Sequence, residues 1–574
     1  MNAPSSEQGM LYDAIVVGSG AGGAMAAYVL CKAGHKVLML EAGRDYNPKT
    51  ETPMFNTNAQ APLMGSGNSD KDFGFYDATV DGGWQVPDEP YTTADDTEFL
   101  WWRARMLGGR TNHWGRYSLR FSHHDFKGKS RDGLGADWPF EYDDIAPWYD
   151  KTEALIGVCG TNTGLDDMPD SGEGVLQPPP KPRIPELLVA AAAKKHGIEL
   201  APMHRAVLTR PLDNRLACFY ATPCGRGCSI GAAFQTTTSL IPMAQATGNL
   251  TIITNAMAKT VNVDQNGRPT GIEYIQKPSG KAHHTHAKNV ILAASACESA
   301  RILLNSKSKH HPKGLANSST QVGKNIMDST GADMGVEVPL LKNRPRYNED
   351  GHTANHLFIP WWGHKAQEKG ELDFPRGYHF EIGSGFRMPG AGVAGDLQGY
   401  GLSLKQIARE NYGTYVHLSL RGEMVPNEHC FMEIDDKVKD KWGIPVVKFH
   451  WRWSEHELKQ VDHGLKTAKL LFETMGARVG DLPPPEQAIK KGGEIIHEVG
   501  STRMGTSPKD SVTNQWGQTW DCDNLYVMDG GVFASNPHKN CTLTIMTLAM
   551  RNASKLAEEL TARKQIQIQG SAHA

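Results

Sequence analysis

The chain has 574 residues, more than a single hydrophobic core usually holds, so we expect two or more domains. A formal net charge of -3, with 39% hydrophobic and 21% charged residues, is typical of a globular protein and gives no footprint for nucleic acid or an anionic membrane. No segment is apolar for long enough to span a bilayer, and the residues before Leu11 lack a signal peptide, so we expect a cytoplasmic location.

The first elements in the sequence form a nucleotide-binding unit. An apolar run over 14–17 predicts a buried strand, the small residues after it predict a helix, and a second strand over 36–40 ends on Glu41. The turn between strand and helix holds three glycines: Gly18, Gly20 and Gly23. Their spacing allows a tight turn, approach of a pyrophosphate to the backbone and close packing of the helix, while Glu41 would accept the ribose hydroxyls. The motif predicts dinucleotide binding without separating NAD from FAD.

Further elements of the same kind stand far downstream. The segment 289–294 predicts a buried strand that leads into a helix over 297–304. Another strand over 524–528 ends on Asp529, and a helix is expected over 542–556. Between these elements short β patterns dominate, which indicates a second, sheet-rich domain.

We therefore predict an α/β fold: a discontinuous Rossmann-like nucleotide-binding domain with a sheet-rich α+β substrate domain inserted in pieces. The nucleotide-binding domain is expected to take four segments: 11–50, 100–125, 230–330 and 485–562. The substrate domain is expected to take three: 51–99, 126–229 and 331–484, with a cysteine-rich loop at 218–228. The last residues, 563–574, are predicted to form a flexible tail.

Four separated motifs resemble the glucose–methanol–choline family of FAD-dependent oxidoreductases. The first is the N-terminal nucleotide unit. The others follow in the family's order: the glycine-rich segment 105–115, the segment 293–299 with its following helix, and the C-terminal pair 497–505 and 540–544. The resemblance covers nearly the whole chain. It implies that FAD is the dinucleotide and that the protein is an oxidoreductase acting on CH–OH groups.

The resemblance also implies catalytic roles. In that family a His at the position of His497 lies over the flavin as the catalytic base, and His or Asn stands at the position of Asn540. Alcohol oxidation moves a hydride to the flavin while a base takes the hydroxyl proton, which suits a neutral imidazole near pH 7. Asn540 would orient the substrate oxygen, and Asn is also a favoured N-cap for the helix that starts around Thr542. His538 is a weaker candidate for the same pocket.

The segment 105–115 resembles the family's loop that lies against the flavin. With the nucleotide unit and the later strand it provides the expected cofactor-binding residues: Gly18, Gly20, Gly23, Glu41, Gly108, Gly109, Asn112, His113 and Asp529. His113, which precedes Trp114, stands where some members attach FAD covalently and others keep the residues without the bond. The sequence leaves both alternatives open.

Three cysteines lie within eleven residues: Cys218, Cys224 and Cys228. Turn-forming residues separate them, so their thiolates can converge on one point, as in iron–sulfur or zinc sites. The loop has no fourth His or Cys, which disfavours zinc. Bacterial sugar dehydrogenases of the family resemble this region and carry an iron–sulfur cluster there, but of their adjacent upstream Cys pair only Cys218 is present here. The alternative is a loop with unrelated, structural thiols.

We predict FAD-dependent oxidation of a secondary ring hydroxyl of a sugar or glycoside, at carbon 3 as in bacterial glucoside 3-dehydrogenases. Electrons would pass through an iron–sulfur cluster to an external acceptor. Three polar-aromatic stretches, 360–364, 378–381 and 450–453, suit a sugar ring better than a sterol. The alternative is an FAD alcohol oxidase that uses oxygen and has structural cysteines. Relatives with a cluster work with a small partner subunit and a cytochrome, and such a partner can carry the signal for export to the periplasm.

Overall fold

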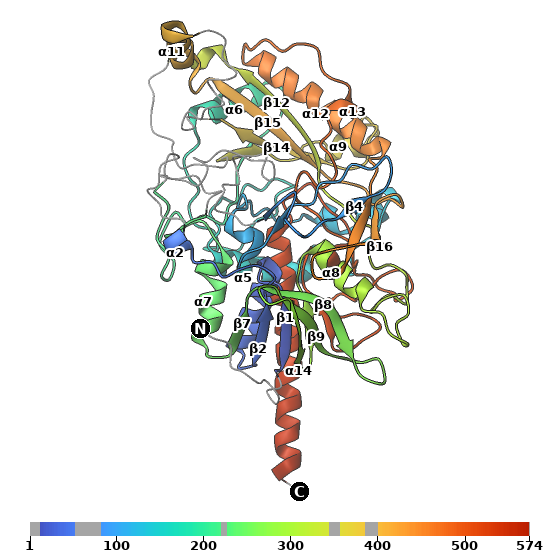
Figure 1. Ribbon diagram of the computed structural model, residues 1–574. Coiled ribbons are helices and arrows are strands. Elements are labelled where there is room, and N and C mark those ends of the chain that lie inside the picture. Colours follow the sequence, from blue (N-terminus) through green and yellow to red (C-terminus); the bar gives the residue numbers. More distant parts are fainter. Residues whose placement is uncertain (1–11, 52–81, 220–226, 344–355, 385–399, 573–574) are drawn as a thin grey trace.

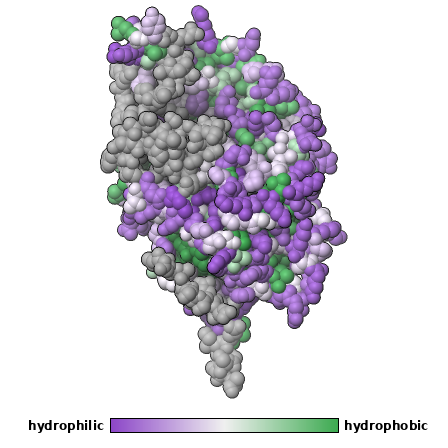
Figure 2. Space-filling view, in the orientation of Figure 1, coloured by the Kyte–Doolittle hydropathy of each residue, from purple (hydrophilic) through white to green (hydrophobic). Residues whose placement is uncertain are grey.

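The computed structural model describes residues 12–51, 82–219, 227–343, 356–384 and 400–572. Two stacked parts make up the molecule. A parallel sheet and the long C-terminal helix lie in the lower part of Figure 1, and a second sheet lies in the upper part. Figure 2 shows one face, on which the described residues are mainly hydrophilic, with apolar side chains in small groups.

The centre of the lower part is a five-stranded sheet in which every neighbouring pair of strands is parallel. In the order β18-β11-β1-β2-β7, the strands are Leu525–Val527, Val290–Leu292, Ala14–Val17, Val37–Leu40 and Leu250–Ile253. The four strands other than β7 are fully buried, as expected for a parallel sheet covered on both faces. The strands come from distant segments of the chain, which agrees with a discontinuous nucleotide-binding domain. The predicted limits of the two domains stay predictions.

Helices cover this sheet. The helix α1 (Ala21–Lys32) follows β1 and packs against α14 (Thr542–Ala572) and α7 (Leu240–Ala246). A further helix, α5 (Tyr142–Ile156), packs against α14, and α8 (Ala296–Asn305) follows β11. One large apolar core joins the sheet to these helices.

The C-terminal helix is longer than the sequence predicts. Instead of ending near Leu556, α14 continues to Ala572 and projects from the body in Figure 1, so residues 563–572 are helical, and the flexibility of this end stays a prediction. Residues 542–569 contain no Gly or Pro, so nothing in the chain ends the helix there. The ammonium group of Lys564 also lies 2.8 Å from the carboxylate of Asp13, which ties this extension to the body.

Smaller sheets flank the parallel sheet. Antiparallel strands β8, β9 and β10 span Ala256–Val263, Pro269–Gln276 and Lys281–His286. A second group joins β16, β17 and β4, which span Phe431–Lys439, Pro445–His450 and Thr92–Thr93. A two-stranded pair joins β3 (Gly82–Gly83) to β5 (Arg103–Ala104).

The upper part is built on a second five-stranded sheet, which is antiparallel throughout. In the order β12-β15-β14-β13-β6, its strands are Thr330–Glu337, Tyr415–Gly422, Tyr378–Gly383, Leu357–Ile359 and Ala201–Pro202. The helix α12 (Glu455–Thr474) packs on β12 and β15, and α6 (Ile184–Lys194) and α13 (Pro485–Ala488) pack on α12. A separate apolar core fills this part, so the sheet-rich substrate domain has its own hydrophobic interior.

Short elements complete the fold: α2 (Pro48–Glu51), α3 (His123–Phe126), α4 (Gly128–Asp132), α9 (His364–Glu368), α11 (Gly401–Asn411), η3 (Gly109–Asn112), η5 (Thr236–Thr238), η6 (Pro339–Leu341) and η7 (Gly530–Val532). Within the described ranges, no helix has both the length and the apolarity that crossing a bilayer requires.

Candidate active site

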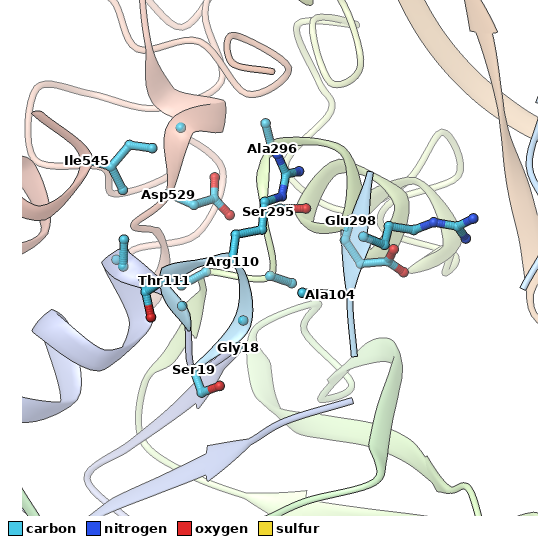
Figure 3. A pocket seen from close by; sticks show the side chains of 18 of the residues that line it. Gly18, Ser19, Ala104, Arg110, Thr111, Ser295, Ala296, Glu298, Asp529 and Ile545 are labelled. Carbon is cyan, nitrogen blue, oxygen red and sulfur yellow. The ribbon is translucent and has the colours of Figure 1, made fainter. Parts of the chain in front are cut away.

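A cavity of about 250 Å³ opens at the carboxyl ends of β1 and β2, where the strand order reverses between β1 and β11. Ligands of open α/β sheets bind at such a switch point. Figure 3 shows that its walls come from distant segments, represented by Gly18 and Ser19, Ala104, Arg110 and Thr111, Ser295, Ala296 and Glu298, and Asp529 and Ile545.

The turn after β1 uses its glycines for different purposes. Gly18 has a φ of +100°, and a Cβ there would lie 2.3 Å from the carbonyl oxygen of Ala293. A Cβ on Gly23 would lie 2.0 Å from the carbonyl oxygen of Gly18, so Gly23 allows α1 to pack against the turn, outside the cavity lining. A Cβ on Gly20 would meet no described atom within 4 Å, because Gly20 lines the cavity. This leaves room for a phosphate at the N-terminus of α1.

Glu41 follows the last residue of β2 and lines the cavity. Its carboxylate accepts hydrogen bonds from the Ser19 amide (3.2 Å), the Ser19 hydroxyl (2.5 Å) and the Gly43 amide (2.7 Å). The Ser19 hydroxyl oxygen in turn accepts a bond from the Gly108 amide at 2.8 Å. Glu41 therefore connects the glycine turn to the loop that precedes η3, and its contact with a ribose stays a prediction.

The segment 108–112, which includes η3, contributes one predicted residue to the lining and keeps two behind it. Gly109 lines the cavity, while Gly108, with a φ of +90°, makes the turn above it. Asn112 is buried behind the wall, where its amide donates to the Leu107 carbonyl at 2.8 Å and accepts from Gln235 at 3.2 Å. Asn112 thus fixes the loop, and a direct contact with the cofactor stays a prediction.

His113 lines the cavity beside Trp102. The indole N–H of Trp102 donates to Nε2 of His113 at 3.1 Å, and the two rings meet edge to face. This bond uses the Nε2 lone pair and indicates a neutral ring with its proton on Nδ1. A covalent link through Nε2 would have to displace Trp102, and whether FAD is attached here stays a prediction.

His497 and Asn540 meet at the cavity, as the sequence predicts for a catalytic pair. Asn540 Nδ2 lies 3.4 Å from His497 Nε2, and the Ser329 hydroxyl lies 2.9 Å from His497 Nδ1. The surrounding protein lowers the pKa of His497 to about 3, because loss of water disfavours the charged ring, although Glu381 opposes this. His497 is therefore a neutral imidazole with both nitrogens engaged.

The turn that carries His497 is strained and held by side chains. Ile496 has a φ of +67°, which is unusual for a β-branched residue. Asp328 accepts hydrogen bonds from the amides of His497 (2.8 Å) and Ile495 (3.2 Å), and Arg110 donates to the Ile496 carbonyl at 3.2 Å. The sequence did not predict a role for Asp328, because the only indication of one is that this polar residue comes just before a strand.

Asn540 points its amide nitrogen at two acceptors. Besides His497, Nδ2 lies 3.3 Å from Oε1 of Glu381, a buried residue of β14. Burial raises the pKa of Glu381, but the positive charge of Arg421 together with hydrogen bonds from His379 and Asn540 lowers it by more, so the carboxyl stays ionised. The Asn540 carbonyl Oδ1 has no hydrogen-bond partner among the described residues, so the N-cap role considered for Asn540 is wrong. Oδ1 is an acceptor that a substrate hydroxyl can use.

Asp529 follows β18 and lines the cavity. Its carboxylate accepts from the Gly531 amide at 2.8 Å and from the Ser299 hydroxyl at 2.6 Å. Burial raises the pKa of Asp529 to about 6. It caps η7 and ties it to Ser299 of the third sequence motif, while a contact with cofactor stays a prediction.

His538 does not reach the cavity lining. It is buried, with Nε2 3.3 Å from Asp167 Oδ1 and Nδ1 3.3 Å from Nδ1 of His379. The weaker candidate for the pocket therefore belongs to a neighbouring polar network.

Two of the three clustered cysteines can be placed. Cys218 and Cys228 belong to one small apolar cluster with Val207 and Ile230, whereas Cys224 lies outside the described residues. The Cys228 amide donates to Gln235 at 2.7 Å, and Gln235 donates to Asn112. Among the residues that the structure describes, no group of three or more His, Cys, Asp or Glu is arranged to hold a metal ion. An iron–sulfur cluster stays a prediction.

The polar-aromatic stretches expected at a sugar site lie elsewhere. Trp361 and Tyr378 are buried in the core of the upper part, and Trp451 packs in the lower core. None of the three lines the cavity. Their aromatic character serves packing, and three other aromatic residues, Trp102, Trp114 and Tyr117, line the cavity instead.

Comparisons with known proteins agree with this architecture. Family models described as GMC oxidoreductase match residues 12–330 and 426–549. The chain is 30% identical over 545 residues to 2-methyl-1,2-propanediol dehydrogenase of Mycolicibacterium austroafricanum, covering 94% of each chain. It is 26% identical over 578 residues to the fructose dehydrogenase large subunit of Gluconobacter japonicus, covering 97% of this chain and 99% of that one.

A solved structure shares the fold. A variant of the formate oxidase of Aspergillus oryzae aligns with a TM-score of 0.65 at 15% identity, covering 96% of this chain and 99% of the other. With family models that match most of its length, the chain belongs to the GMC oxidoreductase family, whose FAD-dependent enzymes oxidise alcohol or sugar hydroxyls.

Proposed function

We propose that this member of the family oxidises a secondary ring hydroxyl of a sugar or glycoside, at carbon 3, with His497 as the base. The observation that carries the proposal is the pair at the cavity: a neutral His497 next to an Asn540 whose carbonyl oxygen has no partner. Together they offer a proton acceptor and a hydrogen-bond acceptor side by side.

The residues present fit FAD. Gly20 has open space where a side chain would be, and a Cβ on Gly109 would lie 3.6 Å from the Gly20 backbone, so the glycines form a cradle without side chains. Gly18, Gly20 and the start of α1 would hold the pyrophosphate, and Glu41 would hold the ribose. When bound there, FAD supplies a two-electron acceptor for the hydride of the alcohol carbon.

The chain's own residues manage the proton and the geometry. His497 Nε2 accepts the hydroxyl proton, since Ser329 engages Nδ1 and leaves Nε2 facing Asn540 and the cavity. Asn540 Oδ1 accepts a hydrogen bond from the substrate, which fixes the carbon whose C–H bond breaks. Two aromatic side chains beside polar walls, Trp114 and Tyr117, favour a sugar ring over an extended chain.

The substrate is tested by anaerobic bleaching of FAD in the purified holoenzyme. We expect methyl β-D-glucopyranoside to bleach the 450 nm band, with D-fructose and 2-methyl-1,2-propanediol as comparisons. Deuterium on carbon 3 of the glycoside should slow bleaching, while deuterium on carbon 2 should not. Bleaching by the diol alone would overturn the sugar assignment, and an isotope effect at another carbon would overturn the regiochemistry.

We also propose that electrons leave through a cluster held by the loop 218–228, toward a small partner subunit and a cytochrome. The support is the hydrogen-bonded connection from Cys228 through Gln235 to Asn112, next to the cavity wall. Stoichiometric iron and acid-labile sulfide in the holoenzyme should confirm it. Cys228→Ser should lose the iron, and Cys430→Ser, a buried thiol away from the loop, should keep it. Flavin without iron would favour an oxidase that uses oxygen.

A further inference from the structure

We propose that a buried chain of side chains exchanges protons between the candidate active site and the surface. The chain, which we call the proton relay, consists of Glu381, His379, His538, Asp167 and His364. The inference rests on the proposed function, because it takes the proton that His497 receives from the substrate as the proton to be removed.

Three of the four contacts between consecutive members of the relay are within hydrogen-bond distance, and the innermost, between Glu381 and His379, is a longer ion-pair contact. The distances are 3.6 Å from Glu381 Oε1 to His379 Nε2, 3.3 Å from His379 Nδ1 to His538 Nδ1, 3.3 Å from His538 Nε2 to Asp167 Oδ1, and 3.3 Å from Asp167 Oδ1 to His364 Nε2. Each of the two central histidines meets one neighbour with Nδ1 and the other with Nε2. An imidazole can take a proton on one nitrogen and release one from the other only in this arrangement.

The relay runs from the interior to the solvent. His379 is 0% exposed and His538 is 2% exposed, whereas the side chain of His364 is 15% exposed at the start of α9. The ring of His364 stacks on that of His124, whose Nε2 lies 3.1 Å from the exposed carboxylate of Asp166. Its inner end, Glu381, contacts Asn540 at the cavity.

The surroundings of the relay favour the neutral form of His538. Burial lowers the pKa of His538 to about 4, and the ammonium of Lys539, 3.2 Å from Nε2, acts in the same direction. Burial raises the pKa of Asp167, but Lys539 at 2.8 Å, together with His538 and His364, holds that pKa well below its ordinary value. Lys539 is itself paired with Asp125, and Arg421 lies 3.9 Å from Glu381. A ring that gains a proton on one nitrogen and loses one from the other keeps its net charge. The rings of His379 and His538 can therefore pass a proton between the carboxylates of Glu381 and Asp167.

The transfer balances without any further reactant. A protonated Glu381 breaks its O–H bond as His379 Nε2 gains a proton, His379 Nδ1 releases its proton to His538 Nδ1, and His538 Nε2 releases its proton to Asp167. Negative charge moves from Asp167 to Glu381, and Asp167 then passes the proton to His364 and to water. The side-chain amide of Asn540 lies between His497 and Glu381 and does not transfer protons. A water in the cavity or a substrate hydroxyl would therefore carry the proton from His497 to Glu381.

The test follows proton release independently of any alcohol. Holoenzyme in weak buffer is photoreduced without oxygen and mixed with ferricenium, while flavin absorbance and a pH-indicator dye are recorded together. Removal of two electrons releases a proton inside the site. In the wild type it should reach the dye together with reoxidation. In His538→Gln and His364→Gln, release should lag behind reoxidation by about 100-fold.

His356→Gln is the matched control, because His356 is also buried and burial lowers its pKa to about 4, but it lies outside the relay. It should show no lag. His364→Gln changes a partly exposed side chain, so it keeps the test valid if His538→Gln misfolds. Release without a lag in both relay variants would overturn the relay. Because light supplies the electrons, a lag in an enzyme that no alcohol reduces would sink the proposed function while keeping the relay.

Discussion

At the residue scale, the role proposed for His497 depends on a neutral ring whose Nε2 faces the amide donor Nδ2 of Asn540 and is therefore the acceptor nitrogen. We predict that His497→Ala lowers kcat by about 100- to 10,000-fold, since it removes the base. FAD should stay bound, because the glycine turn and Glu41 do not depend on this ring. Turnover with an artificial acceptor and flavin content by absorbance check both statements. Full turnover in the variant would reject the assignment.

The pKa of His497 also sets the direction of the pH dependence. The base works only when neutral, so activity is present above this pKa and is lost as pH falls through it. Because the surroundings lower the pKa from an ordinary 6.5 to about 3, we expect kcat/KM to stay level from neutral pH down to about pH 5. A profile of kcat/KM against pH in the holoenzyme tests this. An acid limb centred near or above pH 6.5 would contradict it.

At the element scale, the turn 495–497 owes its shape to one carboxylate. Asp328 accepts amides on both sides of Ile496, whose φ is positive. Asp328→Asn replaces one acceptor oxygen by a donor, which leaves a buried N–H unsatisfied at about 1–3 kcal/mol. We predict a lower kcat with little change in KM, because His497 is displaced while the rest of the cavity is unchanged.

A matched variant separates misplacement of the base from loss of stability. Asp440 also accepts two backbone amides, those of Trp442 and Ile444, at 2.9 Å each, but far along the chain from the catalytic pair. Asp440→Asn should lower the melting temperature and keep kcat. If Asp328→Asn and Asp440→Asn behave alike in steady-state kinetics and thermal melts, Asp328 has no positioning role.

The glycine turn offers a second pair of variants at this scale. Gly23→Ala places a Cβ 2.0 Å from a backbone oxygen, so the apoprotein should lose stability, whereas Gly20→Ala meets no described atom within 4 Å and should not. FAD affinity should nevertheless fall in Gly20→Ala by about 1–3 kcal/mol, because the methyl group enters the space for the pyrophosphate. Thermal melts of the apoproteins and fluorescence titration with FAD measure both effects. Wild-type affinity in Gly20→Ala would place the cofactor elsewhere.

At the scale of the whole molecule, local patterns predicted the architecture well. A Cβ on Gly18 or Gly23 would clash with a backbone oxygen, because the turn is tight and the helix packs closely on it. This geometry requires glycine, so the motif can be recognised directly in the sequence. The parallel sheet follows from apolar strands in distant segments. The helix end near Leu556 was wrong because no residue there stops a helix, and Lys564 adds a contact that spacing does not reveal.

The contacts of the polar shell could not be predicted from the sequence, although Glu381 lies in the stretch 378–381 that we expected at a sugar site. Asp328, Ser329 and Glu381 act on the catalytic pair through contacts between residues more than 150 positions apart. Neither periodicity nor a motif predicts these long-range contacts, because apolar residues determine how the strands beside them pack. Likewise Trp361 looked like a ligand-binding aromatic in sequence, and only packing in the upper core shows what it does.

Glu381 links the two parts of the molecule, because it belongs to the upper sheet and contacts Asn540 of the lower part. As an ionised carboxylate it only accepts hydrogen bonds, so it holds the Asn540 amide with the nitrogen facing Glu381 and the oxygen turned away from it. Glu381→Gln offers both a donor and an acceptor and removes this preference. We predict a higher KM and a kcat lower by about tenfold, the cost of one misplaced charge-assisted hydrogen bond.

Asp333→Asn is the control, since Asp333 lies 3.6 Å from the same Arg421 but on β12, outside the cavity lining. Both variants remove one carboxylate from Arg421, so a general effect on that arginine would appear in both. If the upper sheet acts on catalysis through Asn540, only Glu381→Gln changes KM, and adding Glu381→Gln to Asn540→Ala causes little further loss. Additive losses in this double-mutant cycle would show that Glu381 and Asn540 act independently, and that the upper sheet does not orient the catalytic pair.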